Sequence, residues 1–153
     1  MEKTDLTQAF WADVRKAVPD LPDGYRVRRA SGNPEFAEII MDLILTEKKR
    51  GLFGLKLLQD HQPEQVPTLG GVMVLVDFEG IPRGAVQTVK ITPTPYKDIN
   101  DEHLAVEGPE ARQLDVWQNI HWPYWTTMLE LHGLSPSEDM IVVVEQFKLI
   151  YST

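Results

Sequence analysis

The sequence predicts an α+β domain, a small barrel of mostly antiparallel strands with helices packed around it. Apolar residues recur at helical spacing in several stretches, most clearly between Asn33 and Arg50. Runs rich in β-branched residues then follow between Leu52 and Thr92. The run from Met140 to Tyr151, MIVVVEQFKLIY, begins with unbroken apolar residues, as expected for a strand that is covered on both faces.

The first thirty residues predict one helix and one short strand. Thr4 is a suitable N-cap, and apolar residues follow it at helical spacing as far as Ala17. The segment YRVRRA, which ends at Ala30, fits a short strand. We expect residues 1–30 to form an N-terminal helical extension packed on the core, and residues 31–153 to form the barrel domain.

The second helix has the clearest start signal in the chain. Asn33 is an N-cap candidate, and Pro34 suits the first helical position because its missing N–H would be unpaired there in any case. The basic run Lys48 to Arg50 is expected in the last turn, with Gly51 as the C′ residue. The spacing predicts one buried stripe made of Phe36, Ile39, Ile40, Leu43 and Ile44.

The remaining elements are expected in the following order. Strands are expected at residues 52–58, 71–78 and 85–92, and a short helix capped by Asn100 or Asp101 is expected to end at Val106. A long helix should begin at Leu114, kink at Pro123 and end before Gly133. Its expected core stripe consists of Leu114, Trp117, His121, Tyr124, Trp125, Met128 and Leu129.

Composition excludes several kinds of chemistry. The 153 residues include no Cys, which rules out disulfides, thiolate catalysis and Cys-ligated zinc. The four His residues show no metal-binding spacing, and the Walker, dinucleotide-binding and nucleophilic-serine motifs are missing. We therefore expect no metal and no cofactor. The first residues, MEKTDLTQAF, form no apolar leader, so we expect a cytoplasmic protein without a membrane partner.

Charge limits the kind of partner. A formal net charge of -8 argues against a broad basic surface for nucleic acid. The charge is uneven, however, because residues 1–56 hold ten basic and nine acidic side chains, whereas residues 57–153 hold five and fourteen. An anionic ligand would therefore be drawn to the first part of the chain.

The basic run Lys48 to Arg50 is more than a helix end requires. Cations in a last turn interact favourably with the helix dipole, and one such residue needs no further explanation. Three in succession point about 100° apart on a helix, so at least one should lean toward the strand after Gly51. A lysine desolvated there would have a lowered pKa, and it could act as a base or nucleophile or bind an anion or a base carbonyl.

Five segments together resemble successive blocks of the ASCH domain, a PUA-like β-barrel. They are EFAEIIMDLILTEKK, GGVMVLVDFEGIPRGAVQTVKIT, YKDINDEHLAVEG, LDVWQNIH and EDMIVVVEQFKLIY. The resemblance spans Ser31 to Tyr151, and DEHLAVEG and the final strand are its most specific parts. It implies RNA or nucleoside binding, and some members of the family are hydrolases that act on acetylated cytidine or are ribonucleases.

The resemblance also implies site residues. The family's cleft carries a G-x-K-x-x-[T/S] motif at the helix end and a glutamate in the block similar to DEHLAVEG. These features fall on Lys48 and Glu107, which become the candidate catalytic pair. The motif's glycine is Thr46 here, and its hydroxyl residue is Gly51, so hydrolysis by that route lacks a group. The candidate ligand-binding residues are Lys48, Lys49, Arg50, Glu107 and Arg28.

Three functions follow from these residues. The first is a module that binds RNA, a nucleoside or a nucleobase in a cleft near Lys48 and Glu107, with lysine as donor and glutamate as acceptor. The second is a small hydrolase, in which Lys48 activates water or a hydroxyl and Glu107 transfers protons. The third is a degenerate barrel that serves as a protein-interaction domain. We rank them in that order.

Overall fold

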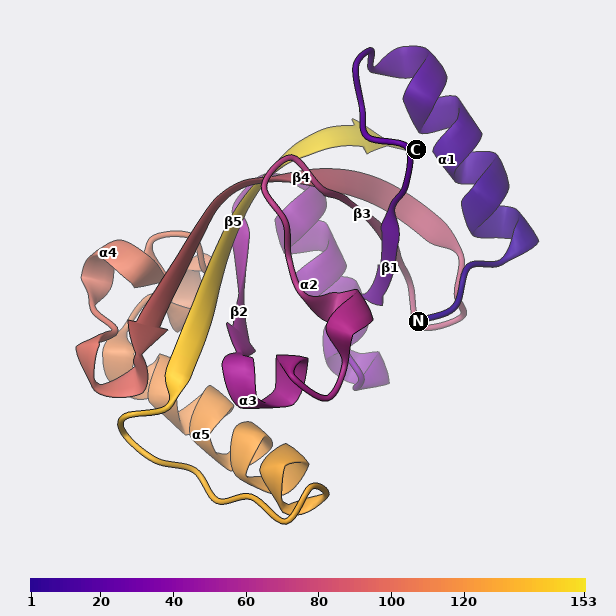
Figure 1. Ribbon diagram of the computed structural model, residues 1–153. Helices are drawn as coiled ribbons and strands as arrows, with labels where there is room; N and C mark the ends of the chain where they lie inside the picture. Colours follow the sequence, from indigo (N-terminus) through magenta and orange to yellow (C-terminus); the bar gives the residue numbers. More distant parts are fainter.

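The computed structural model describes residues 1–153 and contains one five-stranded sheet in the order β1-β3-β4-β5-β2. The strands are β1 (Arg26–Arg29), β2 (Gly51–Leu55), β3 (Val72–Val76), β4 (Pro82–Pro95) and β5 (Ile141–Ser152). Strand β1 pairs with β3 in parallel, and the other pairs are antiparallel. The sheet curls into a half-barrel that is open between β1 and β2 (Figure 1). The α+β prediction is confirmed.

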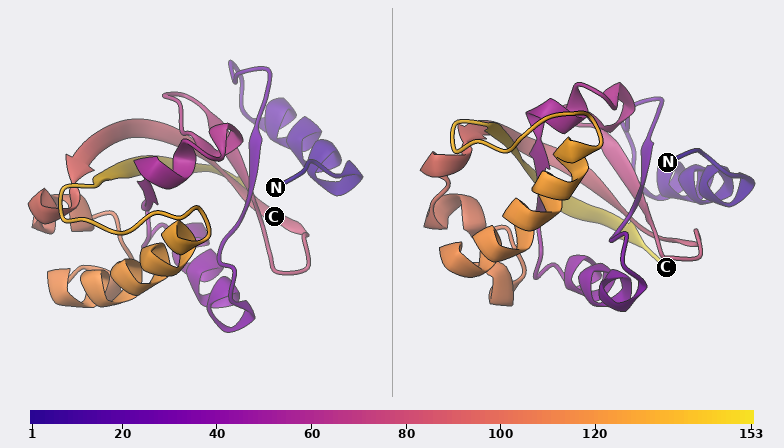
Figure 2. Two further views of the ribbon diagram at one scale, coloured as in Figure 1. Left: turned by 60° about the horizontal axis from the view of Figure 1, so that its bottom comes forward. Right: turned by 90° about the horizontal axis from the view of Figure 1, so that it is seen from below.

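Helices flank the curled sheet on several sides. They are α1 (Asp5–Ala17), α2 (Pro34–Leu45), α3 (Lys56–Gln59), α4 (Asp101–Leu104) and α5 (Leu114–Glu130), with 3-10 turns η1 (Pro63–Gln65), η2 (Tyr96–Asp98) and η3 (Pro109–Ala111). Figure 2 shows α2 and the segment from α3 to η1 at opposite ends of the curl. All of the helices fall short of the length and apolar character that crossing a membrane would require.

The first helix begins as the sequence predicts and packs directly on the sheet. Thr4 caps α1 and forms a capping box with Thr7. Phe10, Trp11 and Val14 are buried against the outer face of β1, β3 and β4. Burial of each such side chain contributes about 1.5–3 kcal/mol to folding. Strand β1, which also lies in the first thirty residues, pairs with β3 within the sheet.

The buried face of α2 differs from the predicted stripe. Ala37, Met41 and Ile44 are buried, whereas Phe36 and Ile39 are 53% and 56% exposed. The helix is apolar around much of its circumference, so residue spacing alone did not fix the face that meets the sheet. The buried face is the one that packs on inner-face residues of β3, β4 and β5.

The end of α2 also differs, and this difference shifts the basic run. The helix ends at Leu45, and Glu47 adopts a left-handed conformation with φ of 61°. The Glu47 N–H donates to the Ile44 carbonyl, and the Lys48 N–H donates to the Leu43 carbonyl. These are the two bonds of a Schellman motif, with Glu47 at the C′ position that we expected Gly51 to take. The basic run therefore lies beyond the helix.

Two other boundaries moved for identifiable reasons. The strand expected over residues 52–58 ends at Leu55, and α3 follows. Strand β4 continues to Pro95, although Pro93 and Pro95 lie within it. Beyond Gln87 the strand has no β3 neighbour, and the Tyr96 N–H donates to the carbonyl of Met140, the residue before β5. Because backbone groups alternate in direction along a strand, the two prolines face the free edge, and no hydrogen bond of the sheet is lost.

Helix α5 runs from Leu114 to Glu130 as one helix and includes Pro123. Trp117, Trp125 and Leu129 are buried as expected, but Leu114 and Tyr124 are exposed. Tyr124 lies close enough to Arg28 to act electrostatically on it, which places it beside the open edge at β1. No strand covers this position, and the core prediction for Tyr124 was therefore wrong.

Candidate functional site

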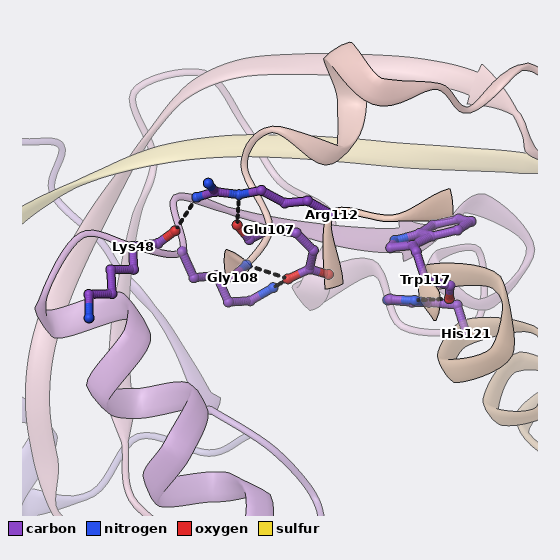
Figure 3. Close-up of polar contacts among 7 residues, drawn as sticks. Lys48, Glu107, Gly108, Arg112, Trp117 and His121 are labelled. Carbon is purple, nitrogen blue, oxygen red and sulfur yellow. Dashed lines mark hydrogen bonds and ion pairs between the residues drawn. The ribbon is translucent and has the colours of Figure 1, made fainter. Parts of the chain in front are cut away.

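Only one member of the basic run turns inward. Lys49 is buried, whereas Lys48 and Arg50 are exposed. The Schellman turn reverses the chain at Glu47, and the N–H groups of Lys48 and Lys49 both donate to the Leu43 carbonyl. Figure 3 shows the Lys48 side chain pointing away from Glu107. The structure therefore brings Lys49, and not Lys48, to the glutamate.

Glu107 is the buried partner of Lys49. The Lys49 ammonium donates to Glu107 Oε1, and the Gly108 N–H donates to the same oxygen at 3.3 Å. The other carboxylate oxygen has no hydrogen bond within the chain. The two side chains are only 9% and 7% exposed, so the pair is largely withdrawn from water.

A close approach of two segments positions this pair. The Arg50 N–H donates to the Val106 carbonyl at 2.7 Å, which holds the start of β2 against the residues after α4. Gly51 allows this approach, because a Cβ there would lie 2.5 Å from Val106 Cγ2 and 2.6 Å from the Glu145 carbonyl. A threonine or serine at residue 51 would not fit without movement of the backbone.

Arg112 ties the same two segments together from outside. Its Nε donates to the Glu107 carbonyl at 2.8 Å, and its Nη2 donates to the Lys48 carbonyl at 2.9 Å (Figure 3). One guanidinium thus bridges the segment after α4 and the turn after α2. No sequence pattern indicated this bridge, because Arg112 lies in a loop, far along the chain from Lys48.

Burial sets the protonation behaviour of Lys49. Desolvation lowers its pKa, and the nearby positive charge of Arg28 acts in the same direction. The charge of Glu107 and its hydrogen bond oppose this effect and favour the ammonium form. The pair is therefore a desolvated charge pair, in which each partner depends on the other.

Two aromatic rings of α5 lie beside this pair. The Trp117 and His121 rings are stacked with centroids 4.5 Å apart, and the charges of Glu107 and Lys49 both act on His121. His121 Nδ1 bonds the Trp117 carbonyl, and desolvation lowers the pKa of His121, which favours the neutral ring. The Trp117 indole N–H is fully buried and has no partner. Sequence periodicity indicated only core roles for both residues.

A second buried ion pair lies on the inner face of the curl. Arg26 of β1 contacts Glu145 of β5 at 2.8 Å, and the Thr88 hydroxyl donates to the same carboxylate oxygen at 2.6 Å. Glu145 is the one charged residue in the largely apolar run MIVVVEQF, and this was the available signal that it has a special role. Arg28 follows Arg26 on the same face of β1.

With Lys49 as the motif lysine, the G-x-K-x-x-[T/S] pattern moves by one residue. Its glycine position then falls on Glu47, whose positive φ is a conformation that glycine adopts most easily. Its hydroxyl position falls on Leu52, which has no hydroxyl. Thr46, the nearest hydroxyl in sequence, donates to the Asp42 carbonyl at 2.6 Å on the surface. Neither alignment supplies the motif hydroxyl.

Two cavities lie elsewhere on the molecule. One, of about 200 Å³, is on the outer face of β4 and β5, and its lining includes Lys90, His103 and Val106. The other, of about 260 Å³, lies next to α3, and its lining includes Lys56 and Val143. Neither is lined by Lys49 or Glu107.

A curled five-stranded mixed sheet with flanking helices is the architecture of a PUA-like barrel protein. The family model described as ASCH domain matches residues 28–151. The chain belongs to the ASCH domain family, as the sequence resemblance indicated.

Solved structures agree on the fold. The crystal structure of an ASCH domain from Lactobacillus crispatus JV V101 has a TM-score of 0.88 and 22% identity, with 97% of this chain and 96% of that chain covered. Protein EF3133 from Enterococcus faecalis V583, assigned to the family DUF984, has a TM-score of 0.81 and 20% identity, with 94% and 86% covered. No curated protein sequence matches the chain significantly.

Proposed function

We propose that this ASCH domain protein binds a nucleobase, as a nucleoside or at the end of a short RNA, at the pair formed by Lys49 and Glu107. The buried pair is the observation that carries the proposal. It presents a donor and an acceptor side by side in a desolvated place, next to the stacked rings of Trp117 and His121. Such an arrangement matches the polar edge of a planar heterocycle.

Each member of the pair has a role that follows from its chemistry. The Lys49 ammonium has three N–H donors and gives one of them to Glu107, so it can donate another to a ring carbonyl. The Glu107 oxygen without a partner can accept from an exocyclic amine. A base that carries both groups, such as cytosine or guanine, fits this pair better than uracil does.

The exposed bases around the pair suit a small ligand rather than a long nucleic acid. Lys48 and Arg50 lie on the surface on either side of Lys49 and can supply positive charge to a phosphate. Arg28 adds a third charge from β1, close enough to lower the pKa of Lys49. Because few phosphates are contacted, we expect affinity to fall only modestly with salt.

Titration of nucleosides with detection by Trp fluorescence tests this function, since Trp117 stacks on His121 and the charges of the pair act on His121. Cytidine, guanosine, uridine and N4-acetylcytidine form the panel. We expect Lys49→Met and Glu107→Gln to weaken cytidine binding at least about tenfold, which corresponds to about 1.4 kcal/mol. Lys56→Met, an exposed lysine on α3, is the control and should bind as the wild type does.

Two outcomes would count against the proposal. Equal affinity of the wild type and Lys49→Met, with loss of binding in Lys48→Met, would move the site to the exposed lysine. Binding of no nucleoside at all by the wild type would favour the alternative that the barrel is a protein-interaction domain. Far-ultraviolet circular dichroism of each variant separates loss of binding from loss of fold.

Hydrolysis is the second candidate function, and one observation favours it. Desolvation lowers the pKa of Lys49, which brings the amine nearer to the range of a general base. The missing motif hydroxyl opposes it, since neither Gly51 nor Leu52 carries one. Incubation with N4-acetylcytidine and with RNA, followed by chromatography, tests for turnover. Equal turnover by the wild type and Glu107→Gln would remove the proposed catalytic role of the glutamate.

A further inference from the structure

Arg28 occupies an unusual position on the inner face of the half-barrel. It pairs in register with Leu75 of β3, and it follows Arg26 by two residues, so both arginines share one face of β1. The Arg26 guanidinium is neutralised by Glu145 at 2.8 Å. Arg28 is thus the second arginine on the inner face of β1.

Arg28 has no partner of its own. It takes part in none of the ion pairs of the chain, and no side-chain hydrogen bond involves it. Burial desolvates the guanidinium and lowers its pKa, while Glu145 opposes this effect from a distance. Its nitrogens are not among the atoms sealed from solvent, so an incoming group can reach them.

The charges around Arg28 do not balance. Arg26, Arg28 and Lys49 supply three positive charges to the inner cluster, and Glu107 and Glu145 supply two negative charges. His121 adds no charge because its lowered pKa favours the neutral ring. One positive charge of this cluster therefore has no acidic partner within it, although the whole chain is strongly acidic.

The group that would compensate it can be identified by its chemistry. A guanidinium presents paired N–H donors in a planar fork that matches the oxygens of a phosphate or carboxylate. The charge of Arg28 also acts on Lys49, which belongs to the pair where the base is proposed to bind. An anion on Arg28 and a base on the pair can therefore belong to one small molecule.

We propose that Arg28 is an anion subsite that receives the phosphate of a nucleotide whose base contacts Lys49 and Glu107. This inference rests on the proposed function and narrows it, since the ligand class becomes a nucleoside monophosphate or the phosphorylated end of a short RNA. A neutral nucleoside would fill only half of the site. Inorganic phosphate alone should bind weakly at Arg28.

Calorimetric titration of the full chain compares cytidine, cytidine 5′-monophosphate, a 5′-phosphorylated cytidine dinucleotide and inorganic phosphate. We expect the wild type to bind the monophosphate at least tenfold more tightly than cytidine. Arg28→Gln should remove this preference and leave the affinity for cytidine within about threefold. Arg15→Gln changes the charge equally at an exposed position of α1 and should keep the preference.

Thermal unfolding provides a second readout that does not depend on the base. Because Arg28 has no partner to lose, Arg28→Gln should melt at or above the wild-type temperature without ligand, and a lower Tm would overturn the claim that it is unpartnered. Inorganic phosphate should raise the Tm of the wild type and not that of Arg28→Gln. Arg28→Lys keeps the charge but lacks the paired N–H donors of the guanidinium. It should retain only part of the preference for cytidine 5′-monophosphate over cytidine.

The outcomes separate this inference from the proposed function. Equal wild-type affinity for cytidine and its monophosphate, or an unchanged preference in Arg28→Gln, would overturn the anion subsite while base binding stands. A wild type that binds neither compound would overturn base binding. Phosphate-dependent stabilisation that is lost in Arg28→Gln would still support the subsite in that case. Tighter binding of the dinucleotide than of the monophosphate would identify an RNA end as the source of the phosphate.

Discussion

Lys49 and Glu107 lie 58 residues apart in the chain, and their side chains form a buried ion pair. Breaking such a pair from one side leaves a desolvated charge without a partner, which costs about 3–5 kcal/mol, whereas replacing both partners with apolar side chains is often neutral. The pair therefore adds little net stability compared with an apolar core, which agrees with the role in ligand recognition that we propose for it.

A double-mutant cycle tests this view of the pair. Lys49→Met should lose about 3–5 kcal/mol of unfolding free energy, because Glu107 stays buried without its cation. The double variant Lys49→Met/Glu107→Met should be more stable than either single variant. Urea unfolding of the four proteins gives the coupling energy. If the loss of unfolding free energy in the double variant equalled the sum of the losses in the two single variants, the two side chains would not interact.

Gly51 should resist substitution for reasons of space. Its Cβ in Gly51→Ala would meet Val106 and the Glu145 carbonyl at 2.5–2.6 Å, so we expect a loss of about 1–3 kcal/mol. Gly32→Ala is the matched control, because nothing lies within 4 Å of a Cβ there. Thermal unfolding compares the two variants. Equal Tm values would contradict the close approach of β2 to the segment after α4.

The left-handed backbone of Glu47 predicts that replacing this residue with glycine will stabilise the protein. A left-handed residue with a Cβ costs about 1–2 kcal/mol, so Glu47→Gly should raise stability by about 0.5–1 kcal/mol after the entropy cost of glycine. Glu47→Ala removes the same carboxylate but keeps the Cβ, and it should not give this gain. Urea unfolding of both variants checks the result. A gain in Glu47→Ala as large as that in Glu47→Gly would assign the effect to charge instead of backbone conformation.

His121 should make stability depend on pH. Desolvation lowers its folded pKa below the ordinary value of 6.5, so the unfolded chain takes up a proton before the folded chain does. Its contribution is complete above pH 6.5 and is lost as pH falls through the folded pKa, by at most about 1.4 kcal/mol per pH unit. Unfolding free energies at pH 7.5 and 5.5 should differ less in His121→Gln than in the wild type. A proton NMR titration that gave His121 a pKa of 6.5 or above would refute this.

Local signals in the sequence predicted much of the fold. Thr4 and Asn33 cap their helices as expected, and the run from Met140 forms the long strand β5. These features depend on capping and on apolar periodicity, which operate within a few residues. The family resemblance likewise extends over most of the chain and was confirmed.

The site was harder to predict because its geometry depends on contacts between distant segments. Three adjacent basic residues gave no sign of which side chain would turn inward. The direction of the chain is set by Glu47, which takes the left-handed conformation after α2 that glycine usually adopts, so its residue type did not reveal the turn. The pairing of Arg26 with Glu145 joins residues 119 positions apart, and it follows only from the strand order. The same limit applied to Arg112, whose bridge becomes visible only once both segments are in place.

The most direct test of the central claim is a crystal structure of the protein soaked with cytidine. We expect the Lys49 ammonium to donate to a carbonyl or ring nitrogen of the base, with Glu107 accepting from its amine. Cytidine bound instead in the outer-face cavity beside Lys90 and His103, with the pair untouched, would contradict the account.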